Sequence, residues 1–343
     1  MKTFLRLAFL AFGIFIVGCK GPPPEKFTGS GSTFVWPIMA RWTSEFERAE
    51  GIKVDYRPKG SSGGIEDLFA RKVDFACSDG PLNDDKVAKL KERGEEVIHI
   101  PLVLSAVVAV YNLDEIAEPI RFTGPVLADI YLGKIKTWND KGIQELNPGL
   151  KLPAKSITVA YRSDGSGTTY IWTDYLSKVS EEWKKKVGTD RSVTWPVGTG
   201  ADGNEGVAEH VKKTPGSIGY VDLADAFRKS LSFGLVQNHQ KEFVKASLES
   251  VKQAADNSLK QIPEDLRYSL TDSPGKGAYP SSGTTWAIVY LDQKKNKKGT
   301  QLVSFLRWLT SDGQLFAEQL LYAKLPTELA DKAHIAVERI TVR

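Results

Sequence analysis

Cysteine and histidine are scarce in this chain of 343 residues, which contains two cysteines and four histidines. Beyond the first nineteen residues only Cys77 remains, so no disulfide can form within the folded body, and an apolar run around Cys77 is typical of a small buried side chain. The chain also lacks the lysine-containing phosphate loop, the HExxH motif and the CxxC motif. Nothing in the sequence therefore indicates a nucleotide hydrolase, a metal site or a cofactor.

Excess charge of one sign is also absent. The formal net charge is +4, and Lys2 and Arg6 contribute two of these charges within an N-terminal segment that has no acidic residue. The remaining body is nearly neutral, which excludes a nucleic-acid partner held by bulk charge. Any affinity for anions must be local.

Residues 1–19 have the pattern of an export signal. Two basic residues stand beside an apolar run over 7–18, which is too short to span a bilayer as a mature helix. The run ends Ile-Val-Gly-Cys, which resembles the lipobox of bacterial lipoproteins and implies that Cys19 is lipidated and anchors the protein to a membrane. A plain secretory signal with an incidental cysteine is the alternative. Residues 20–26, which include three prolines, are expected to form a stiff tether.

Strands alternate with helices along the rest of the chain, which predicts an α/β fold with mainly parallel sheets. Strands are expected at 53–57, 73–77, 97–111, 157–161, 217–221 and 285–290. Helices are expected at 34–50, 65–71, 84–93, 125–132, 168–179, 206–213 and 300–309. The apolar run 100–111 is long for one strand, so we expect it to leave one lobe and enter another, with a hinge in its middle. One large sheet is the alternative that periodicity leaves open.

Three short stretches rich in glycine and hydroxyl residues, 29–34, 60–64 and 164–168, each lead into an expected helix. The first turn of a helix has N–H groups without intrahelical partners and the positive end of the helix dipole. Glycine lets an oxyanion approach this backbone, and Ser or Thr adds a hydroxyl donor. Three such stretches together predict a cage for one small oxyanion.

The first two stretches supply mainly backbone donors. Residues 28–31 should turn out of a short strand, and Ser32 or Thr33 can cap the helix, which leaves the N–H groups of Thr33 and Phe34 for a ligand. Ser61 follows a strand at the carboxyl edge of a sheet, where α/β folds bind ligands, and offers both its N–H and its hydroxyl.

The third stretch adds the charge. Arg162 ends a strand and can contact two oxygens of a tetrahedral anion, and Asp164 can hold its guanidinium in place. A surface arginine beside an ordinary turn is the alternative.

Asp79 follows another strand and has the opposite character. An ionised carboxylate only accepts hydrogen bonds, so it tolerates an anion only if that anion brings a proton. Phosphate has a proton near neutral pH and sulfate has none, so Asp79 would reject sulfate. Without this context Asp79 is an ordinary turn residue.

Several segments resemble the phosphate-binding proteins of bacterial Pst-type ABC phosphate uptake systems, and the resemblance covers nearly the whole mature chain. It is seen over 29–34, 60–64, 73–82, 129–138, 146–153, 164–168, 215–221 and 292–295. It implies a type II periplasmic-binding-protein fold of two α/β lobes joined by a hinge, with the ligand in the cleft between them. The implied lobe I is 27–103 plus 276–343, and lobe II is 104–275.

The same resemblance implies a binding site. Its ligand contacts fall on Thr33, Phe34 (through its N–H), Ser61, Asp79, Arg162, Ser166, Gly167 and Thr168, and Asp164 matches the acid that pairs with the arginine. Gly80 stands where alanine is more usual, which we expect to have no consequence. Tyr161 stands where a second basic residue can occur, so the local positive field is expected to be weaker.

The function implied is that of an extracytoplasmic, monomeric lipoprotein that captures inorganic phosphate and catalyses nothing. It would deliver phosphate to the membrane permease subunits of an ABC importer with its ATPase. Sulfate, molybdate and arsenate are the alternative ligands. The argument from Asp79 excludes fully deprotonated anions, but arsenate shares the protonation of phosphate and is not separated.

Two other motifs compete with this interpretation. Residues 60–64 fit G-x-S-x-G, which would make Ser62 the nucleophile of a serine hydrolase, but its four possible histidine partners stand in no distinctive turn. These are His99, His210, His239 and His334. Residues 198–203 fit G-x-G-x-x-G, with Asp222 near the expected acid spacing, but they follow no convincing strand and are interpreted as a turn.

Overall fold

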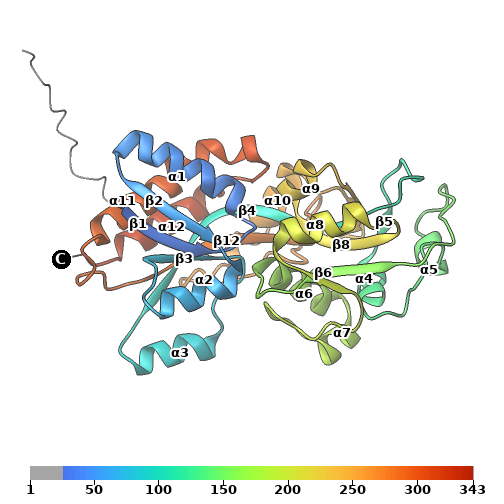
Figure 1. Cartoon of the computed structure of the whole chain (residues 1–343), viewed down its shortest axis with the longest axis horizontal. Coiled ribbons are helices and arrows are strands. Elements are labelled where there is room, and N and C mark those ends of the chain that lie inside the picture. Colours follow the sequence, from blue (N-terminus) through green and yellow to red (C-terminus); the bar gives the residue numbers. More distant parts are fainter. Residues whose placement is uncertain (1–25, 343) are drawn as a thin grey trace, which may run out of the picture.

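The computed structural model describes residues 26–342 and arranges them as two lobes side by side (Figure 1). The expected export signal, Cys19 and residues 20–25 lie outside the described residues. Lys26, the last residue of the expected tether, instead begins the first strand. Within residues 26–342, no helix has the length and apolar character needed to span a membrane.

The first lobe combines the N-terminal and C-terminal parts of the chain. Its sheet has the strand order β2-β1-β3-β12-β4, in which β12 runs antiparallel to both neighbours. The strands are β1 (Lys26–Gly31), β2 (Lys53–Pro58), β3 (Phe75–Ser78) and β12 (Ser282–Tyr290). The helices are α1 (Trp36–Glu50), α2 (Gly60–Phe69), α3 (Asp84–Glu92), α11 (Gly299–Thr310) and α12 (Thr327–Glu338), with the 3-10 turns η2 (Asp312–Phe316) and η3 (Glu318–Leu320).

The second lobe continues the sheet with the order β4-β8-β6-β7, and β9 also pairs with β4. Its strands are β6 (Thr158–Arg162), β7 (Thr199–Ala201), β8 (Ser217–Asp222) and β9 (Ser232–Phe233), with a small sheet of β5 (Arg121–Phe122), β10 (Leu235–Gln237) and β11 (Phe243–Val244). Its helices are α4 (Gly124–Tyr131), α5 (Lys141–Gln144), α6 (Gly167–Val179), α7 (Glu181–Lys186), α8 (Gly203–Lys213) and α9 (Leu223–Arg228). Helix α10 (Leu248–Asp256) and η1 (Leu259–Gln261) lie on the return path to the first lobe.

Strand β4 (Val97–Tyr111) joins the lobes, as expected for the long apolar run. It pairs with β12 up to Ala106 and with β8 from Val107 onward. The Val107 N–H donates to the Ser281 carbonyl at 2.8 Å, which ties β4 to the segment that returns from the second lobe. Strand pairing is thus continuous through both lobes. The lobe limits at 103/104 and 275/276 stay predictions.

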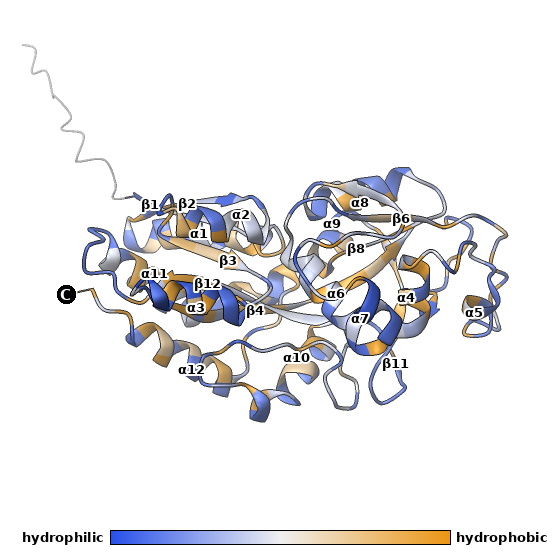
Figure 2. Ribbon diagram, turned by 90° about the horizontal axis from the view of Figure 1, so that it is seen from below, coloured by the Kyte–Doolittle hydropathy of each residue, from blue (hydrophilic) through white to orange (hydrophobic). Residues whose placement is uncertain are grey.

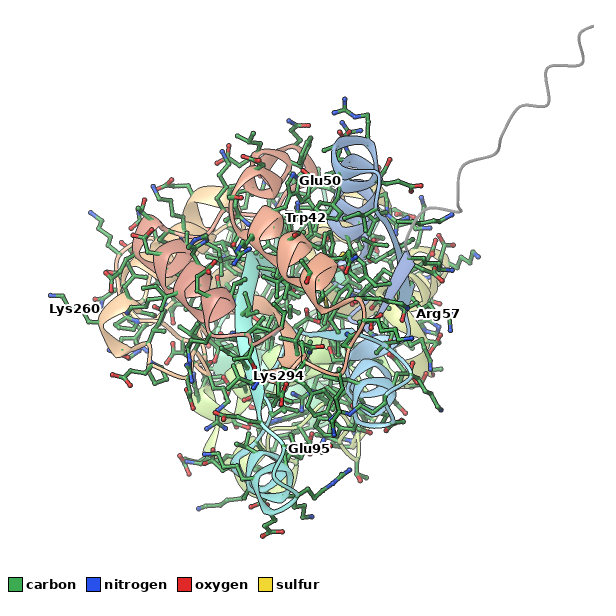
Figure 3. All side chains as sticks on the ribbon, turned by 90° about the vertical axis from the view of Figure 1, so that its left-hand side faces the viewer. Trp42, Glu50, Arg57, Glu95, Lys260 and Lys294 are labelled. Atoms are coloured by element: carbon green, nitrogen blue, oxygen red, sulfur yellow. The ribbon has the colours of Figure 1, made fainter. Side chains whose placement is uncertain are left out.

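The apolar core follows the shared strands. Every residue of β8 and β12 is buried, and β4 is buried except at its first residue. The long strand β4 carries mostly hydrophobic residues (Figure 2). Trp42 of α1 is fully buried, and its indole N–H donates to the Gly313 carbonyl at 2.7 Å. Figure 3 places Trp42 among the helices of the first lobe, whereas Lys260 projects into solvent. The C-terminal segment is therefore an integral part of this lobe.

The structure corrects what the sequence predicted for the two glycine-rich stretches of the first lobe. Residues 28–31 continue β1 instead of turning, and α1 begins at Trp36 without a side-chain cap on Val35. Helix α2 begins at Gly60 rather than at residue 65, so the second glycine-rich stretch is helical. Glycine is a weak helix former, which hides this helix in the sequence. It is required by packing, because a Cβ at Gly64 would lie 2.4 Å from the Gly31 Cα.

Candidate functional site

The three glycine-rich stretches meet where the two lobes touch. The Ser62 N–H donates to the Gly165 carbonyl at 2.9 Å, which joins the second stretch to the third. A Cβ at Gly167 would lie 2.4 Å from the Ser61 Oγ and 2.5 Å from an Asp79 carboxylate oxygen. Only glycine fits at position 167 while the lobes are in this arrangement.

Asp79 is the centre of this contact and is 2% exposed. The Ser32 hydroxyl lies 2.7 Å from both of its carboxylate oxygens, and the Thr285 Oγ1 donates to Oδ1 at 2.6 Å. The Ser61 Oγ is farther, at 3.5 Å. Burial raises the pKa of Asp79 to about 6, against the opposing effects of the hydroxyl donors and of the charges on Arg162 and Arg191. Asp79 is therefore mainly ionised at neutral pH and acts as an acceptor.

Arg162 comes from the end of β6 and is 3% exposed. It forms a two-pronged bond with Asp164, with Nε to Oδ1 at 2.7 Å and Nη2 to Oδ2 at 2.5 Å. Burial opposes ionisation of Asp164, but the hydrogen bonds and charge of Arg162 outweigh it and lower the pKa of the carboxyl. The remaining nitrogen, Nη1, donates to the Thr168 Oγ1 at 3.3 Å and to the Asn204 Oδ1 at 3.0 Å.

Asn204 links this arginine to the first lobe. It is fully buried near the start of α8, and its Nδ2 donates to the Thr33 Oγ1 at 3.3 Å. One amide thus bonds Arg162 of one lobe and Thr33 of the other. These two hydrogen bonds of Asn204 form together only when Arg162 and Thr33 lie close to each other.

Several donors in the cage are not used by the protein. Within residues 26–342, no acceptor is found for the backbone N–H groups of Thr33, Phe34, Ser61, Gly167 and Thr168. The Ser166 Oγ accepts from the Thr169 N–H at 3.2 Å as the cap of α6, so its own proton remains available. Free N–H groups at helix starts, one arginine and one carboxylate suit a small anion that also has a proton.

Tyr220 and the aromatic rings stacked on it hold Arg162 in position. The Tyr220 hydroxyl accepts from the Arg162 N–H at 3.1 Å and lies 2.6 Å from the Thr169 Oγ1. The Tyr220 ring stacks on Trp172 and on Trp195, with ring centroids 5.5 and 5.6 Å apart. These stacked rings, of which Tyr220 and Trp172 are fully buried, hold the end of β6 and the first turn of α6 in one geometry.

Sequence reasoning missed five contributors to the site. Ser32, Thr285, Asn204, Arg191 and Tyr220 all lie in or behind the cage. Asn204 falls just after the formal G-x-G-x-x-G of 198–203, whose middle is not a turn but strand β7, paired with β6. That strand-to-helix position could have indicated Asn204. Nothing in the sequence marks Thr285 or Arg191.

The remaining motif residues have other surroundings. Tyr161 stacks on Trp195 with ring centroids 5.0 Å apart, so it belongs to the aromatic support. Gly80 is tightly packed, because a Cβ there would lie 2.6 Å from the Tyr170 ring. Among the described side chains, none of the histidines is hydrogen-bonded to Ser62, and His99 instead accepts from the Leu82 N–H at 3.1 Å. The geometry of a hydrolytic triad is not assembled in this part of the chain.

Comparisons with known proteins agree with this architecture. A family model for the PBP superfamily domain matches residues 20–313. A relative from Xylella fastidiosa (strain Temecula1), named phosphate-binding protein PstS, is 41% identical over 306 residues, which cover 89% of this chain and 82% of the relative. A PstS from Pasteurella multocida is 40% identical over 309 residues, covering 90% of this chain and 88% of the relative.

Solved structures show the same fold. A periplasmic phosphate-binding protein, PfluDING with bound phosphate, matches with a TM-score of 0.70 and 18% identity over 91% of this chain and 93% of its own. A second match is a structure from Clostridium perfringens, described as a putative phosphate ABC transporter substrate-binding protein with bound phosphate. Its TM-score is 0.62 and its sequence identity 19%, and the match covers 88% of this chain and 100% of the other. At these identities the match concerns the fold alone.

The buried carboxyl of Asp79 makes stability depend on pH. Its pKa is about 6 when folded and 3.8 ordinarily, so the folded protein holds this proton more tightly, and the group lowers stability as pH rises from about 4 to 6. We expect Asp79→Asn to gain stability relative to the phosphate-free wild type over this interval, by roughly 1 to 3 kcal/mol. Urea unfolding between pH 4 and 7.5 measures the difference. Asp331→Asn, at an exposed position, is the control, and a difference that stays constant with pH would contradict the assignment.

Proposed function

This chain belongs to the PstS family within the PBP superfamily, and on that premise we propose that it captures inorganic phosphate in the cleft between its lobes. It is an extracytoplasmic substrate-binding protein of an ABC transporter rather than an enzyme. Phosphate would pass from the cleft to the permease subunits, and the ATPase of the importer would drive its uptake. No cofactor is needed for capture.

One observation carries this proposal: the buried carboxylate of Asp79 lies beside backbone N–H donors that bond no acceptor within residues 26–342. Phosphate near neutral pH has one or two protons, so it can donate one hydrogen bond to Asp79 while its other oxygens accept from the cage. Sulfate would face the same carboxylate with no proton to offer. Repulsion and an unmade hydrogen bond then oppose its binding.

Each predicted contact has a role in this proposal. The backbone N–H groups and hydroxyls of the three stretches surround the ion, Asp79 accepts its proton, and Arg162 supplies the positive charge. Asp164 fixes the arginine, as its two bonds of 2.7 and 2.5 Å support. The residues proposed to contact phosphate are Thr33, Phe34, Ser61, Asp79, Arg162, Ser166, Gly167 and Thr168. Arsenate would fit by the same chemistry.

We further propose that Cys19 carries the acyl chains that anchor the protein to a membrane and that residues 20–25 act as the tether. All proposed contacts come from one chain, so the protein would work as a monomer, which light scattering can check. The first described residue, Lys26, begins β1, at the opposite end of that strand from Gly31 and the first stretch. An anchor attached there would leave the cleft free to open.

Calorimetric titration of the wild type with phosphate and with sulfate tests the proposed function directly. We expect tight phosphate binding and no measurable sulfate binding. In Asp79→Asn, the preference for phosphate over sulfate should fall by at least about tenfold, because an amide can donate to sulfate. A wild type that binds neither ion would refute the function, and unchanged selectivity in the variant would refute the role of Asp79.

Removal of the Arg162 guanidinium tests whether its positive charge binds phosphate. Arg162→Ala should weaken phosphate binding at least about tenfold, because a buried, charge-assisted contact is worth upward of about 1.5 kcal/mol. Titration calorimetry provides the affinity, and Arg121→Ala, at an exposed arginine of the second lobe, is the matched control. An affinity equal to that of the control would remove Arg162 from the site.

The anchor has its own test. Cys19→Ala should move the protein from the membrane fraction to the soluble fraction of fractionated cells, because no other acyl attachment site is proposed. Phosphate affinity should stay unchanged, since Cys19 is not among the residues proposed to contact phosphate. Continued recovery of the variant with membranes to the same extent as the wild type would rule out anchoring through Cys19.

A further inference from the structure

A second buried arginine, Arg191, lies at the contact between the lobes and is not among the residues proposed to contact phosphate. It is 4% exposed and belongs to the loop between α7 and β7. This loop is fixed to the second lobe: the Arg191 carbonyl accepts from the Ser166 N–H at 2.9 Å, and the Asp190 carbonyl accepts from the Thr173 hydroxyl at 3.1 Å. The backbone of Arg191 is thus attached to the start of α6, which carries the third stretch.

The side chain of Arg191 crosses to the first lobe. Its Nη2 donates to the Gly80 carbonyl at 2.5 Å and to the Pro81 carbonyl at 2.6 Å, and its Nε lies 3.4 Å from the Ser78 Oγ. These acceptors flank Asp79 in the chain. One residue therefore connects the loop of Asp79 to the loop of Ser166, and these guanidinium bonds exist only while the lobes touch.

The charge of Arg191 also matters to the cage. The ion pair of Arg162 is made with Asp164, which offsets part of its charge, and within residues 26–342 Asp79 forms no ion pair. In the same part of the chain, no carboxylate forms an ion pair with the Arg191 guanidinium, which donates to neutral acceptors; only its backbone N–H donates to a carboxylate, that of Asp190. Its field stabilises the ionised form of Asp79 and would also favour an anion beside it. Arg191 thereby provides positive charge that the aromatic Tyr161 cannot.

Gly80 is fitted to this arrangement. Without a side chain at position 80, the Tyr170 ring packs directly on the loop, and the Arg191 guanidinium lies 5.5 Å from the centre of that ring. A methyl group at Gly80 would lie 2.6 Å from ring atoms of Tyr170, so the ring would have to shift. The glycine, the tyrosine and the arginine form one packed unit across the lobe contact.

We propose that Arg191 is a clasp that holds the closed lobes together and slows the release of phosphate without touching it. The inference rests on the proposed function and extends it to the kinetics of the same site. A group that acts only after closure changes the dissociation rate far more than the association rate. That asymmetry distinguishes a clasp from a residue that attracts the ion during its approach.

The test compares Arg191→Met with the wild type by stopped-flow tryptophan fluorescence at increasing phosphate concentrations. The slope of the observed rate gives association, and its intercept gives dissociation. We expect dissociation at least about tenfold faster and association changed less than about threefold, since two charge-assisted bonds are lost from the closed state only. Arg191→Lys keeps the charge but not the planar fork, and its dissociation should remain several-fold faster than that of the wild type.

Arg121→Met, in which the lost guanidinium lies 5.5 Å from the Phe243 ring within the second lobe, controls for loss of a ring-stacked arginine. Thermal unfolding of each phosphate-free variant shows that it is folded. Unchanged dissociation in Arg191→Met, slower association as the main effect, or full rescue by lysine would each overturn the clasp. If the wild type itself does not bind phosphate, the proposed function fails instead, so the two failures are distinguishable.

Discussion

The site depends on one constraint, which is that an ionised carboxylate must be buried where two lobes meet. Water cannot solvate Asp79 there, so hydroxyl groups from three separate elements do so: Ser32 after β1, Ser61 in α2 and Thr285 in β12. Burying a charge is costly unless it is hydrogen-bonded. The three hydroxyl groups of the first lobe supply these hydrogen bonds, and Arg162 and Arg191 of the second lobe add positive charge nearby.

The lobe contact is close because side chains are missing from it. Gly167 lies against Ser61 and Asp79, and Gly165 lies against the side chain of Ser62. Any Cβ at these positions would overlap atoms of the opposite lobe. The same glycines keep backbone N–H groups accessible, so close packing and anion binding impose the same residue choice. This explains why the glycine-rich stretches are both the contact surface and the source of donors.

Local features of the sequence predicted much of this structure. The alternation of strands and helices, the long strand over 97–111 and the strand-to-helix turn after Arg162 are encoded by nearby residues, and the structure confirms them. The start of α2 was missed because its glycines are chosen by packing on β1 rather than by helix propensity. Thr285 and Arg191 were missed for a related reason. Each is placed beside Asp79 by strand pairing or lobe contact, which no local pattern records.

Strand β4 has a consequence for how the two halves of the molecule can move. A sliding motion would have to break the ladder that β4 forms with β12 on one side and with β8 on the other. A bend near Ala106 and Val107 leaves nearly all of those bonds intact. The pairing of β4 therefore favours a swing of the lobes over a sideways displacement. Because one continuous strand belongs to both lobes, it would bring them back to the same alignment at each closure, and the parts of the cage with them.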